Sequence, residues 1–282
     1  MPELPELEVM REVLSDRVTG REIANVRVLH PEILKTVDPP VARLVGETFR
    51  CVSRRGKHLV LTCADDLHLV LHLMLAGRLV LSREPAKATK ATALLVSFAD
   101  GGDLRVIENT KVRRAGVFVV NAPGDVRRVA EQGVEPLSEA FTPEWLAATV
   151  AGARRQLKTL LTDQRTIAGI GSAYADEIAF VAGLSPLRYV STLSSEEVKR
   201  LHGAVGDVLQ EAIEAIRLQS DGAQIGDHDR GFARVYKQTG RPCVRCGTPI
   251  AEIRYAEKRT YYCPKCQTGD KLLRDRRSWL TR

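Results

Sequence analysis

Four of the six cysteines constrain the fold of this chain more than any other feature of its sequence. They form two pairs with C-x2-C spacing, Cys243 with Cys246 and Cys263 with Cys266, and sixteen residues separate the pairs. This spacing is typical of a tetrahedral zinc site with four thiolate ligands. Disulfides are the alternative, but we expect an intracellular chain, in which thiols stay reduced. The sequence therefore predicts one structural Zn²⁺, because four protein ligands leave no open position on the metal.

The segment around these cysteines is also strongly basic. Residues 251–262 are interpreted as two strands of a hairpin with Lys258 and Arg259 near its tip. The last 42 residues hold 11 basic and 4 acidic residues, so the whole formal excess of +7 lies there. Such a concentration is expected of a protein that binds a polyanion. A solvated basic tail explains the charge alone about equally well. The remaining cysteines, Cys51 and Cys63, are expected to be buried as small hydrophobic residues.

The 282 residues predict about two domains, and the residue pattern divides the chain further. Residues 1–135 contain one helix and then short apolar runs at 23–30, 57–63, 67–73, 93–98 and 116–120, which predict a sandwich or barrel-like sheet. In residues 136–238 the pattern turns helical: Thr142 and Pro143 begin one helix, and Ser194 with Glu197 forms a capping box before a long helix reaching about Leu218. Residues 239–282 form the cysteine module.

The N-terminal sequence predicts neither a secreted nor a membrane protein. It is acidic and lacks the apolar core of a signal peptide. The apolar run at 67–75 is too short to span a bilayer and contains two histidines. We therefore expect a cytoplasmic protein without a membrane partner.

The N-terminal stretch MPELPELEVM has an unusual arrangement of proline and glutamate. Pro5 suits the N1 position of a helix, and acidic residues suit a helix N-terminus, but Pro2 lies outside that first turn. Removal of Met1 would leave Pro2 with a free amine, and α-amino groups have a reference pKa of about 7.7–8.0. Such an amine can attack an aldehyde-like carbon to give an iminium ion, with Glu3 as general acid and Glu6 orienting the amine or a water. A proline at position 2 without any function is the commoner case.

Several motifs appear together in a fixed order. They are MPELPELEV, RRGK (54–57), GVEPLSEAF (133–141), GIGSAYADE (169–177), VYKQTGRPC (235–243) and the paired C-x2-C. In these motifs the chain resembles the formamidopyrimidine-DNA glycosylase / endonuclease VIII family of base-excision repair, over essentially its whole length. The resemblance implies an α+β multidomain fold. Its parts are an N-terminal β-sandwich with a flanking helix (1–135), a helix–two-turn–helix DNA-binding domain (136–238) and a zinc-finger β-hairpin with a basic tail (239–282).

The resemblance also implies a reaction and its partner. The partner is double-stranded DNA with damaged bases or abasic sites. For the oligomeric state, a monomer is the default expectation. Pro2 attacks the deoxyribose C1′, the base departs, and the Schiff base eliminates the flanking phosphates, while Glu3 protonates the opening sugar and Glu6 supports it. The other roles that the resemblance implies are a catalytic lysine on a sandwich strand that meets a phosphate (Lys57), an arginine that faces the orphaned base (Arg113), DNA contacts in the helical domain (Lys158, Gly171, Ser172), and DNA-binding and catalytic residues at the hairpin tip (Lys258, Arg259).

The sequence departs from the family pattern at positions that read the lesion. Leu75 stands at the intercalating methionine, Ala115 at an aromatic wedge, Ser172 at an asparagine and Lys258 at an arginine. Ser172 can still cap its helix. These changes predict an open pocket, and we hypothesise activity on oxidised pyrimidines, abasic sites or bulky adducts. A non-catalytic DNA-damage-binding protein of the same fold is the alternative. A zinc-ribbon transcription or translation factor would not explain the N-terminal half.

Overall fold

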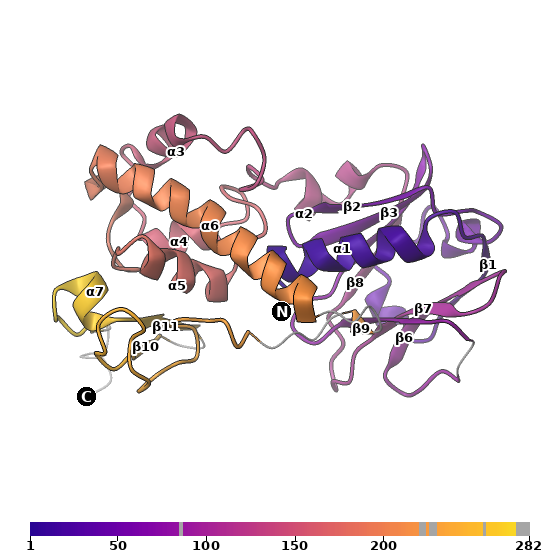
Figure 1. Cartoon of the computed structure of the whole chain (residues 1–282). Helices are drawn as coiled ribbons and strands as arrows, with labels where there is room; N and C mark the ends of the chain where they lie inside the picture. Colours follow the sequence, from indigo (N-terminus) through magenta and orange to yellow (C-terminus); the bar gives the residue numbers. More distant parts are fainter. Residues whose placement is uncertain (85–86, 220–223, 226–229, 256–257, 275–282) are drawn as a thin grey trace. The chain divides into compact units, whose positions relative to one another are not determined.

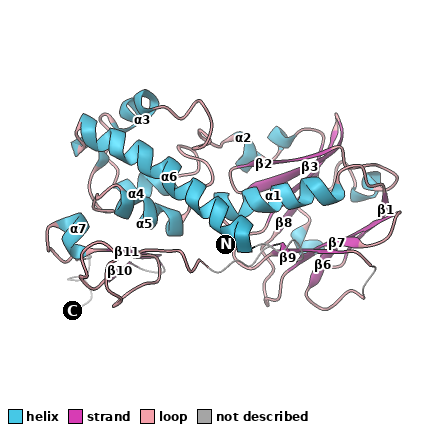
Figure 2. Cartoon of the chain, in the orientation of Figure 1, coloured by secondary structure: helices cyan, strands magenta, loops and turns pink. Residues whose placement is uncertain are grey.

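The computed structural model describes residues 1–84, 87–219, 224–225, 230–255 and 258–274 (Figure 1). The chain divides into two compact units. Unit 1 consists of Met1–Gln132 and Ile213–Asp229, and unit 2 consists of Gly133–Ala212 and Arg230–Arg282. Figure 2 shows that most strands belong to unit 1 and most helices to unit 2.

Two antiparallel sheets form the body of unit 1. One sheet has the strand order β2-β3-β4-β8 and the other β1-β6-β7-β5-β9. The strands of the first sheet are β2 (Cys51–Arg55), β3 (His58–Ala64), β4 (Leu67–His72) and β8 (Gly116–Val120). Those of the second are β1 (Ile23–Val28), β5 (Arg78–Ser82), β6 (Thr92–Phe98), β7 (Asp103–Ile107) and β9 (Gln224–Ile225). The predicted β-sandwich is confirmed.

The four-stranded sheet of unit 1 is buried on both faces. Along β3, Leu59 and Leu61 point into the main core, whereas Val60 points to the opposite face, as the two-residue period of a strand requires. That opposite face is covered by apolar residues of the short helix α2 (Arg127–Ala130) and the residues before it. Helix α1 (Leu4–Val18) lies along β2 and β3 and buries one side in the main core (Figure 1).

The apolar runs in the sequence identified five strands of unit 1, namely β1, β3, β4, β6 and β8. The sequence did not predict β2, β5, β7 and β9, which carry charged residues or are only two residues long. Cys63 is buried as expected, but the expectation for Cys51 is wrong. Cys51 is exposed because its neighbour Val52 points into the core, so that Cys51 faces outward on β2.

Unit 2 is built mainly from helices. They are α3 (Pro143–Val150), α4 (Leu157–Thr162), α5 (Ser172–Val181) and α6 (Ser195–Gln219), of which α6 contributes its last residues to unit 1. Thr142 Oγ1 accepts the Trp145 amide over 3.0 Å at the start of α3. At the start of α6, the Ser194 amide donates to Glu197 Oε2 over 2.9 Å and the Glu197 amide donates to Ser194 Oγ over 3.3 Å. Both predicted caps are confirmed.

The cysteine module packs on α5. It comprises the hairpin of β10 (Ala251–Tyr255) and β11 (Lys258–Tyr262) and the short helix α7 (Pro264–Thr268). Phe180 of α5 shares a buried cluster with Val235, Ile250 and Tyr261. Four 3-10 turns complete the described elements: η1 (Pro31–Ile33), η2 (Val41–Leu44), η3 (Pro123–Asp125) and η4 (Val190–Thr192). Among the described residues, no helix is long and apolar enough to cross a membrane.

Candidate active site and zinc site

Helix α1 positions the N-terminal candidate residues. Its N-cap is Glu3 and its first residue is Leu4, so Pro5 occupies the second helical position, not the expected first. The helix begins one residue earlier because Glu3 and Glu6 form a capping box, which Leu4 at the cap position could not do. The Glu3 amide donates to Glu6 Oε2 over 2.9 Å, and both side chains are nearly buried, at 4% and 3% exposed. Glu6 therefore fixes the peptide that joins Pro2 to Glu3.

Lys57 lies in a turn and not on a strand, which corrects the expectation from the resemblance. The antiparallel register of β2 and β3 pairs Arg55 with His58, so the two residues between them close the hairpin. Two residues are enough to connect antiparallel strands. Only 7% of Lys57 is exposed, so the surrounding protein restricts where this side chain can lie.

An ion pair fastens helix α1 to this turn. Arg54 on β2 donates from Nε to Glu8 Oε2 on α1 over 2.8 Å, and from Nη1 to the carbonyl oxygen of Gly56 over 3.1 Å. Burial raises the pKa of Glu8, but the hydrogen bonds and charges of Arg54 and Arg11 outweigh burial and hold that pKa below its ordinary value. Glu8 is therefore ionised at neutral pH. The helix of the N-terminal candidates is thus tied to the turn that carries Lys57.

One buried and one partly buried histidine lie beside the same turn. The rings of His58 on β3 and His72 on β4 have their centroids 4.5 Å apart. Burial lowers the pKa of His58 to about 4. Burial, together with the charges of His58, Arg128 and Lys57, lowers the pKa of His72 to about 3. Both rings are neutral at neutral pH, and His72 Nδ1 accepts the Met74 amide over 3.3 Å.

Two loops of unit 1 present apolar side chains to solvent. Leu75, after β4, is 64% exposed, and Val112, between β7 and β8, is 67% exposed. The first loop turns sharply because Met74 has a left-handed backbone with φ of 51°. Ala115, the position of the expected wedge, is buried in the main core. In this loop the exposed apolar side chain is therefore Val112 and not Ala115.

Arg113, in the same loop, is folded against unit 1. Its Nη1 lies 3.4 Å from Glu32 Oε1, and its Nη2 donates to the carbonyl oxygen of Lys90 over 3.0 Å. Its Nε is buried without a hydrogen-bond partner in the described part of the chain. Glu108 closes the loop by accepting the amides of Arg114 and of the next residue at 3.0 and 2.9 Å. The protein itself thus holds the Arg113 guanidinium.

Gly171 and Ser172 lie at the start of α5. Gly171 is the N-cap and Ser172 is the exposed first helical residue, so the expectation that Ser172 caps this helix is wrong by one position. The side chain of Gln164 holds the turn before the helix, accepting the Gly169 amide over 2.9 Å and donating to the Ile170 carbonyl over 2.6 Å. The first turn of α5 contains no acidic residue. Such a helix N-terminus suits an anion, for example a phosphate.

Lys158 on α4 forms a buried ion pair with Asp176 on α5. Its Nζ lies 2.7 Å from Asp176 Oδ1 and 2.8 Å from Oδ2, and it donates to the carbonyl oxygen of Arg259 over 2.7 Å. The Tyr261 amide donates to the same carboxylate over 3.2 Å. Burial raises the pKa of Asp176 to about 7, against the lowering influence of Lys158. The pair joins α4, α5 and β11, and it brings the predicted residues Lys158 and Arg259 together.

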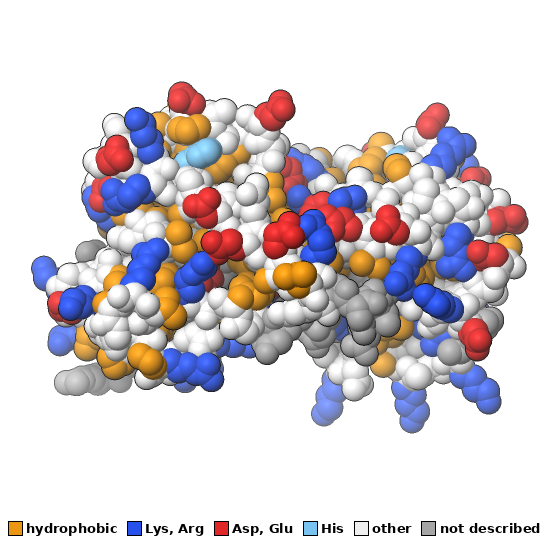
Figure 3. Space-filling view, viewed as in Figure 1, with side chains coloured by type: hydrophobic (Ala, Val, Ile, Leu, Met, Phe, Trp, Pro, Cys, Tyr) orange, Lys and Arg blue, Asp and Glu red, His pale blue; other side chains and the backbone are white. Residues whose placement is uncertain are grey.

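The hairpin tip carries the two remaining candidate residues. Arg259 is exposed and pairs with Arg254 across the hairpin. Lys258 begins β11 opposite Tyr255, but its side chain lies outside the described part of the chain. On the face shown in Figure 3, basic side chains are prominent over this module.

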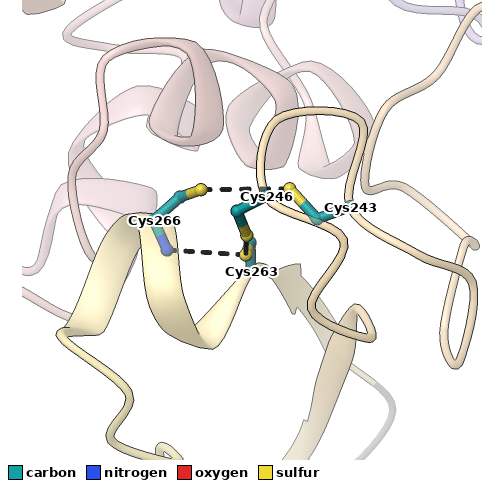
Figure 4. Close-up of side chains that lie close together, drawn as sticks. All are labelled: Cys243, Cys246, Cys263 and Cys266. Atoms are coloured by element: carbon teal, nitrogen blue, oxygen red, sulfur yellow. Dashed lines mark hydrogen bonds between the residues drawn. The ribbon is translucent and has the colours of Figure 1, made fainter.

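The sulfur atoms of the four paired cysteines converge between the Cys243–Cys246 loop and the start of α7 (Figure 4). All four Sγ atoms lie within 4.8 Å of one another, with 3.9 Å between Cys243 and Cys266 and 3.4 Å between Cys246 and Cys263. Tetrahedral zinc with Zn–S bonds of about 2.3 Å requires S···S distances of roughly 3.8 Å. These residues therefore fit one zinc ion. The thiolate of Cys263 also caps α7, because it accepts the Cys266 amide over 3.5 Å.

Two polar side chains hold this module on the helical part of unit 2. Glu177 on α5 accepts the three consecutive amides of residues 234–236, at 2.9, 2.9 and 2.8 Å. Gln267 on α7 accepts the Cys263 amide over 2.8 Å and donates to the Leu184 carbonyl over 2.9 Å. The zinc ligands are thus fixed relative to α5, whose N-terminus carries Gly171 and Ser172.

Sequence reasoning missed several residues of these sites. Asp176 and Glu177 lie inside the motif GIGSAYADE, so a signal for them was present. Val112 and His58 had no such signal, because the exposure of the first and the ring contact of the second depend on tertiary structure.

Comparison with known protein families matches three segments of the chain. Residues 1–117 match the formamidopyrimidine-DNA glycosylase N-terminal domain, and residues 132–221 match the H2TH domain of the same glycosylase. Residues 240–269 match a zinc finger found in FPG and IleRS. The predicted helical domain and zinc finger are confirmed, and the four cysteines bind one structural zinc ion.

Individual proteins match over nearly the whole chain. A formamidopyrimidine-DNA glycosylase from Moorella thermoacetica is 38% identical over 263 residues, which cover 90% of this chain and 95% of that protein. The Lactococcus lactis Fpg has been solved with DNA containing an abasic site, with a TM-score of 0.84, 28% identity, and coverage of 94% of this chain and 99% of that one. The complex of the same protein with DNA containing an oxidised pyrimidine has a TM-score of 0.85 and 29% sequence identity. This match covers 95% of this chain and 100% of that chain.

Proposed function

The chain belongs to the formamidopyrimidine-DNA glycosylase family, and on this basis we propose that it is a bifunctional DNA glycosylase and AP lyase of base-excision repair. It removes damaged, oxidised bases from double-stranded DNA and cleaves the strand at the resulting abasic site. The observation that carries the proposal is the group of Pro2, Glu3 and Glu6 at the start of α1, tied to the turn of Lys57. A non-catalytic damage-binding protein is not favoured, because this group is intact.

The glycosylase step uses the N-terminus of α1. Removal of Met1 exposes the Pro2 amine at the positive end of the helix, which favours its unprotonated, nucleophilic form. The Pro2 nitrogen bonds to C1′ of the damaged nucleotide, the bond from C1′ to the base breaks, and the departing base takes up the proton that the nitrogen loses. Glu3 protonates the ring oxygen as the sugar opens, which leaves an iminium ion between Pro2 and C1′. Glu6 acts through the backbone by holding the Glu3 amide.

The lyase step follows from the same iminium ion. This ion makes the C2′ proton acidic; once the proton leaves, the C3′–O bond breaks and its electron pair departs with the phosphate. A second elimination at C5′ releases the other phosphate. We assign Lys57 to a phosphate, because an ammonium group stabilises the charge that develops there.

The remaining candidates are assigned to DNA binding. Leu75 and Val112 are exposed aliphatic side chains on two loops and are suited to enter the space that an extruded base leaves. Arg113 faces the orphaned base after exchanging Glu32 and Lys90 for DNA.

On unit 2, the proposed DNA contacts lie at the α5 N-terminus and the hairpin tip. Gly171 and Ser172 hold a backbone phosphate there. Arg259, with Lys258 beside it in the sequence, binds the phosphates around the lesion and assists catalysis. Lys158 acts by holding the backbone of Arg259, because its ammonium group already binds the Asp176 carboxylate and the Arg259 carbonyl.

We retain three further proposals. The domains are residues 1–135, 136–238 and 239–282, supported by three family matches that fall in these parts of the chain. The protein acts at the nucleoid, in the cytoplasm, because its partner is DNA. Its preferred lesions are oxidised pyrimidines, abasic sites or bulky adducts, supported by the aliphatic Leu75 and Val112 and the buried Ala115. Efficient excision of 8-oxoguanine opposite cytosine, with little action on other lesions, would contradict this preference.

Borohydride trapping on DNA with an abasic site tests the proposed chemistry. The mature protein should form a covalent adduct that peptide mass mapping locates at residue 2. Pro2→Gly, and protein that retains Met1, should lose the adduct. Pro5→Ala is the matched control, because it changes a proline of the same segment and should keep the adduct. Absence of an adduct with the wild-type protein, under conditions where it binds the DNA, would support the damage-binding alternative.

A further inference from the structure

We propose that Gln132 is a positioning residue for the lyase step, because it clamps the Gly56–Lys57 turn and thereby fixes Lys57. This inference rests on the proposed role of Lys57. Gln132 belongs to none of the motifs that carry the family resemblance, and it is the last residue of the first segment of unit 1.

Gln132 contacts Arg55, Gly56 and His58, the residues on either side of Lys57. Arg55 Nη2 donates to the Gln132 carbonyl oxygen over 2.7 Å. The Gln132 side-chain amide and His58 Nδ1 are hydrogen-bonded over 3.0 Å. The same amide lies directly against Gly56, where an added Cβ would stand 1.8 Å from Oε1 and 2.5 Å from Cδ. The backbone carbonyl and the side chain of Gln132 together therefore cover the turn from Arg55 to His58.

The clamp is itself held by a packed surface. Gln132 follows α2, and the backbone N–H of Gln132 donates to the Val129 carbonyl oxygen over 3.3 Å. Val129 and Val126 pack with Val60 and Val70 on the outer face of the four-stranded sheet. This packing fixes the position of the Gln132 backbone. The hydrogen bonds of Gln132 to Arg55 and His58 then fix the position of the turn.

The clamp also explains the residue at position 56. Gly56 has a φ of +53°, a left-handed conformation that glycine adopts without steric cost. Gly46 has a φ of +85°, but a Cβ added there would meet nothing within 4 Å. Alanine at position 46 therefore tests the backbone strain alone, whereas alanine at position 56 also displaces the Gln132 amide.

Single-turnover kinetics separate the two chemical steps. In Gln132→Met, which keeps the length of the side chain but not its hydrogen bond to His58, β-elimination at an abasic site should slow about tenfold, since small misplacements of a catalytic group cost this much or more. Borohydride trapping at Pro2 should stay within about twofold of wild type by the same reasoning. Gly56→Ala should reproduce the defect, and Gly46→Ala should not.

A double variant decides between positioning and general loss of structure. Added to Lys57→Ala, Gln132→Met should slow elimination no further, because Gln132 acts through Lys57. An equal slowing in both backgrounds would overturn the inference in favour of a structural role. Normal elimination in Gln132→Met would overturn the clamp alone, whereas normal elimination in Lys57→Ala would overturn the role of Lys57 and the clamp with it. If the wild-type protein formed no borohydride-trapped adduct at all, the proposed function itself would be rejected.

Discussion

Replacing Lys158 by methionine should destabilise unit 2 in a manner that depends on pH. Methionine keeps the apolar stem of the side chain but removes the ammonium group that binds the Asp176 carboxylate. Asp176 is fully buried, so its charge would lose a partner that water cannot replace. Removing one member of a buried ion pair typically costs about 3–5 kcal/mol.

The size of this effect at each pH follows from Asp176, whose pKa is raised to about 7. Below pH 7 the carboxyl group is mostly protonated, so Lys158 has little charge to stabilise. Loss of Lys158 raises the pKa of Asp176 further, since the ammonium group lowers it in the wild-type protein. The stability difference between wild type and Lys158→Met therefore grows above pH 7 by about 1.4 kcal/mol per pH unit. Between pH 6 and pH 8.5 it should increase by about 2 kcal/mol.

Urea unfolding at these two pH values measures the difference in the free energy of unfolding. Hydrogen exchange of the Tyr261 amide gives a local measure, because this amide donates to the same carboxylate. Asp176→Asn and the double variant with Lys158→Met complete a double-mutant cycle. The double variant should recover most of the loss, since it removes the buried charge together with its partner.

Two outcomes would refute this reasoning. A loss of stability in Lys158→Met that is the same at pH 6 and pH 8.5 would show that the carboxylate charge is not involved. Additive effects in the cycle, within about 0.5 kcal/mol, would show that Lys158 and Asp176 are not energetically coupled.

Three further predictions concern the other sites. Replacing Cys266 by alanine, or removing zinc with a chelator, should unfold the hairpin and weaken DNA binding. A zinc-release assay measures the loss of metal, and a DNA titration measures the affinity. Unchanged DNA affinity after complete release of zinc would contradict this prediction. The free energy of unfolding of unit 1 should fall as the pH drops from about 6.5 to about 4. In this range His58 is protonated in the unfolded chain but stays neutral in the folded chain. Because the pKa of His58 in the folded chain is about 4, the loss is on the order of 3 kcal/mol. Urea titrations check this, and His58→Gln should reduce the dependence without abolishing it, because the pKa of His72 is lowered as well. Glu177→Ala leaves three backbone amides without their acceptor and should cost on the order of 3 kcal/mol; hydrogen exchange of residues 230–240 should rise, and unchanged exchange would count against it.

The fold could be predicted from the sequence where one local pattern dominates. The spacing of the four cysteines predicted the zinc module, and the caps at Thr142 and Ser194 predicted the starts of α3 and α6. The sequence did not predict strands β2, β5 and β7. These strands contain charged residues, and they are held in place by neighbouring strands of the sheet rather than by an apolar composition of their own.

The candidate site was predictable only in part for a similar reason. Motifs located Pro2, Glu3 and Lys57 along the chain, but they did not predict the contacts that hold these residues. Gln132 lies 75 positions after Lys57, and nothing in the sequence shows that its amide covers that turn. Arg113 was expected to project toward DNA, whereas the structure holds it against Glu32, a contact that local sequence does not reveal.

The three amides that Glu177 accepts have a consequence for how the sequence can change in length. The chain joins the zinc module through residues 234–236, and a single carboxylate on α5 fixes that point. The position of the zinc ligands in unit 2 therefore does not depend on how many residues separate Ile225 from Arg230. Insertions and deletions in that interval can accumulate without displacing the metal site. The chain can thus vary there in length while the zinc module stays in place.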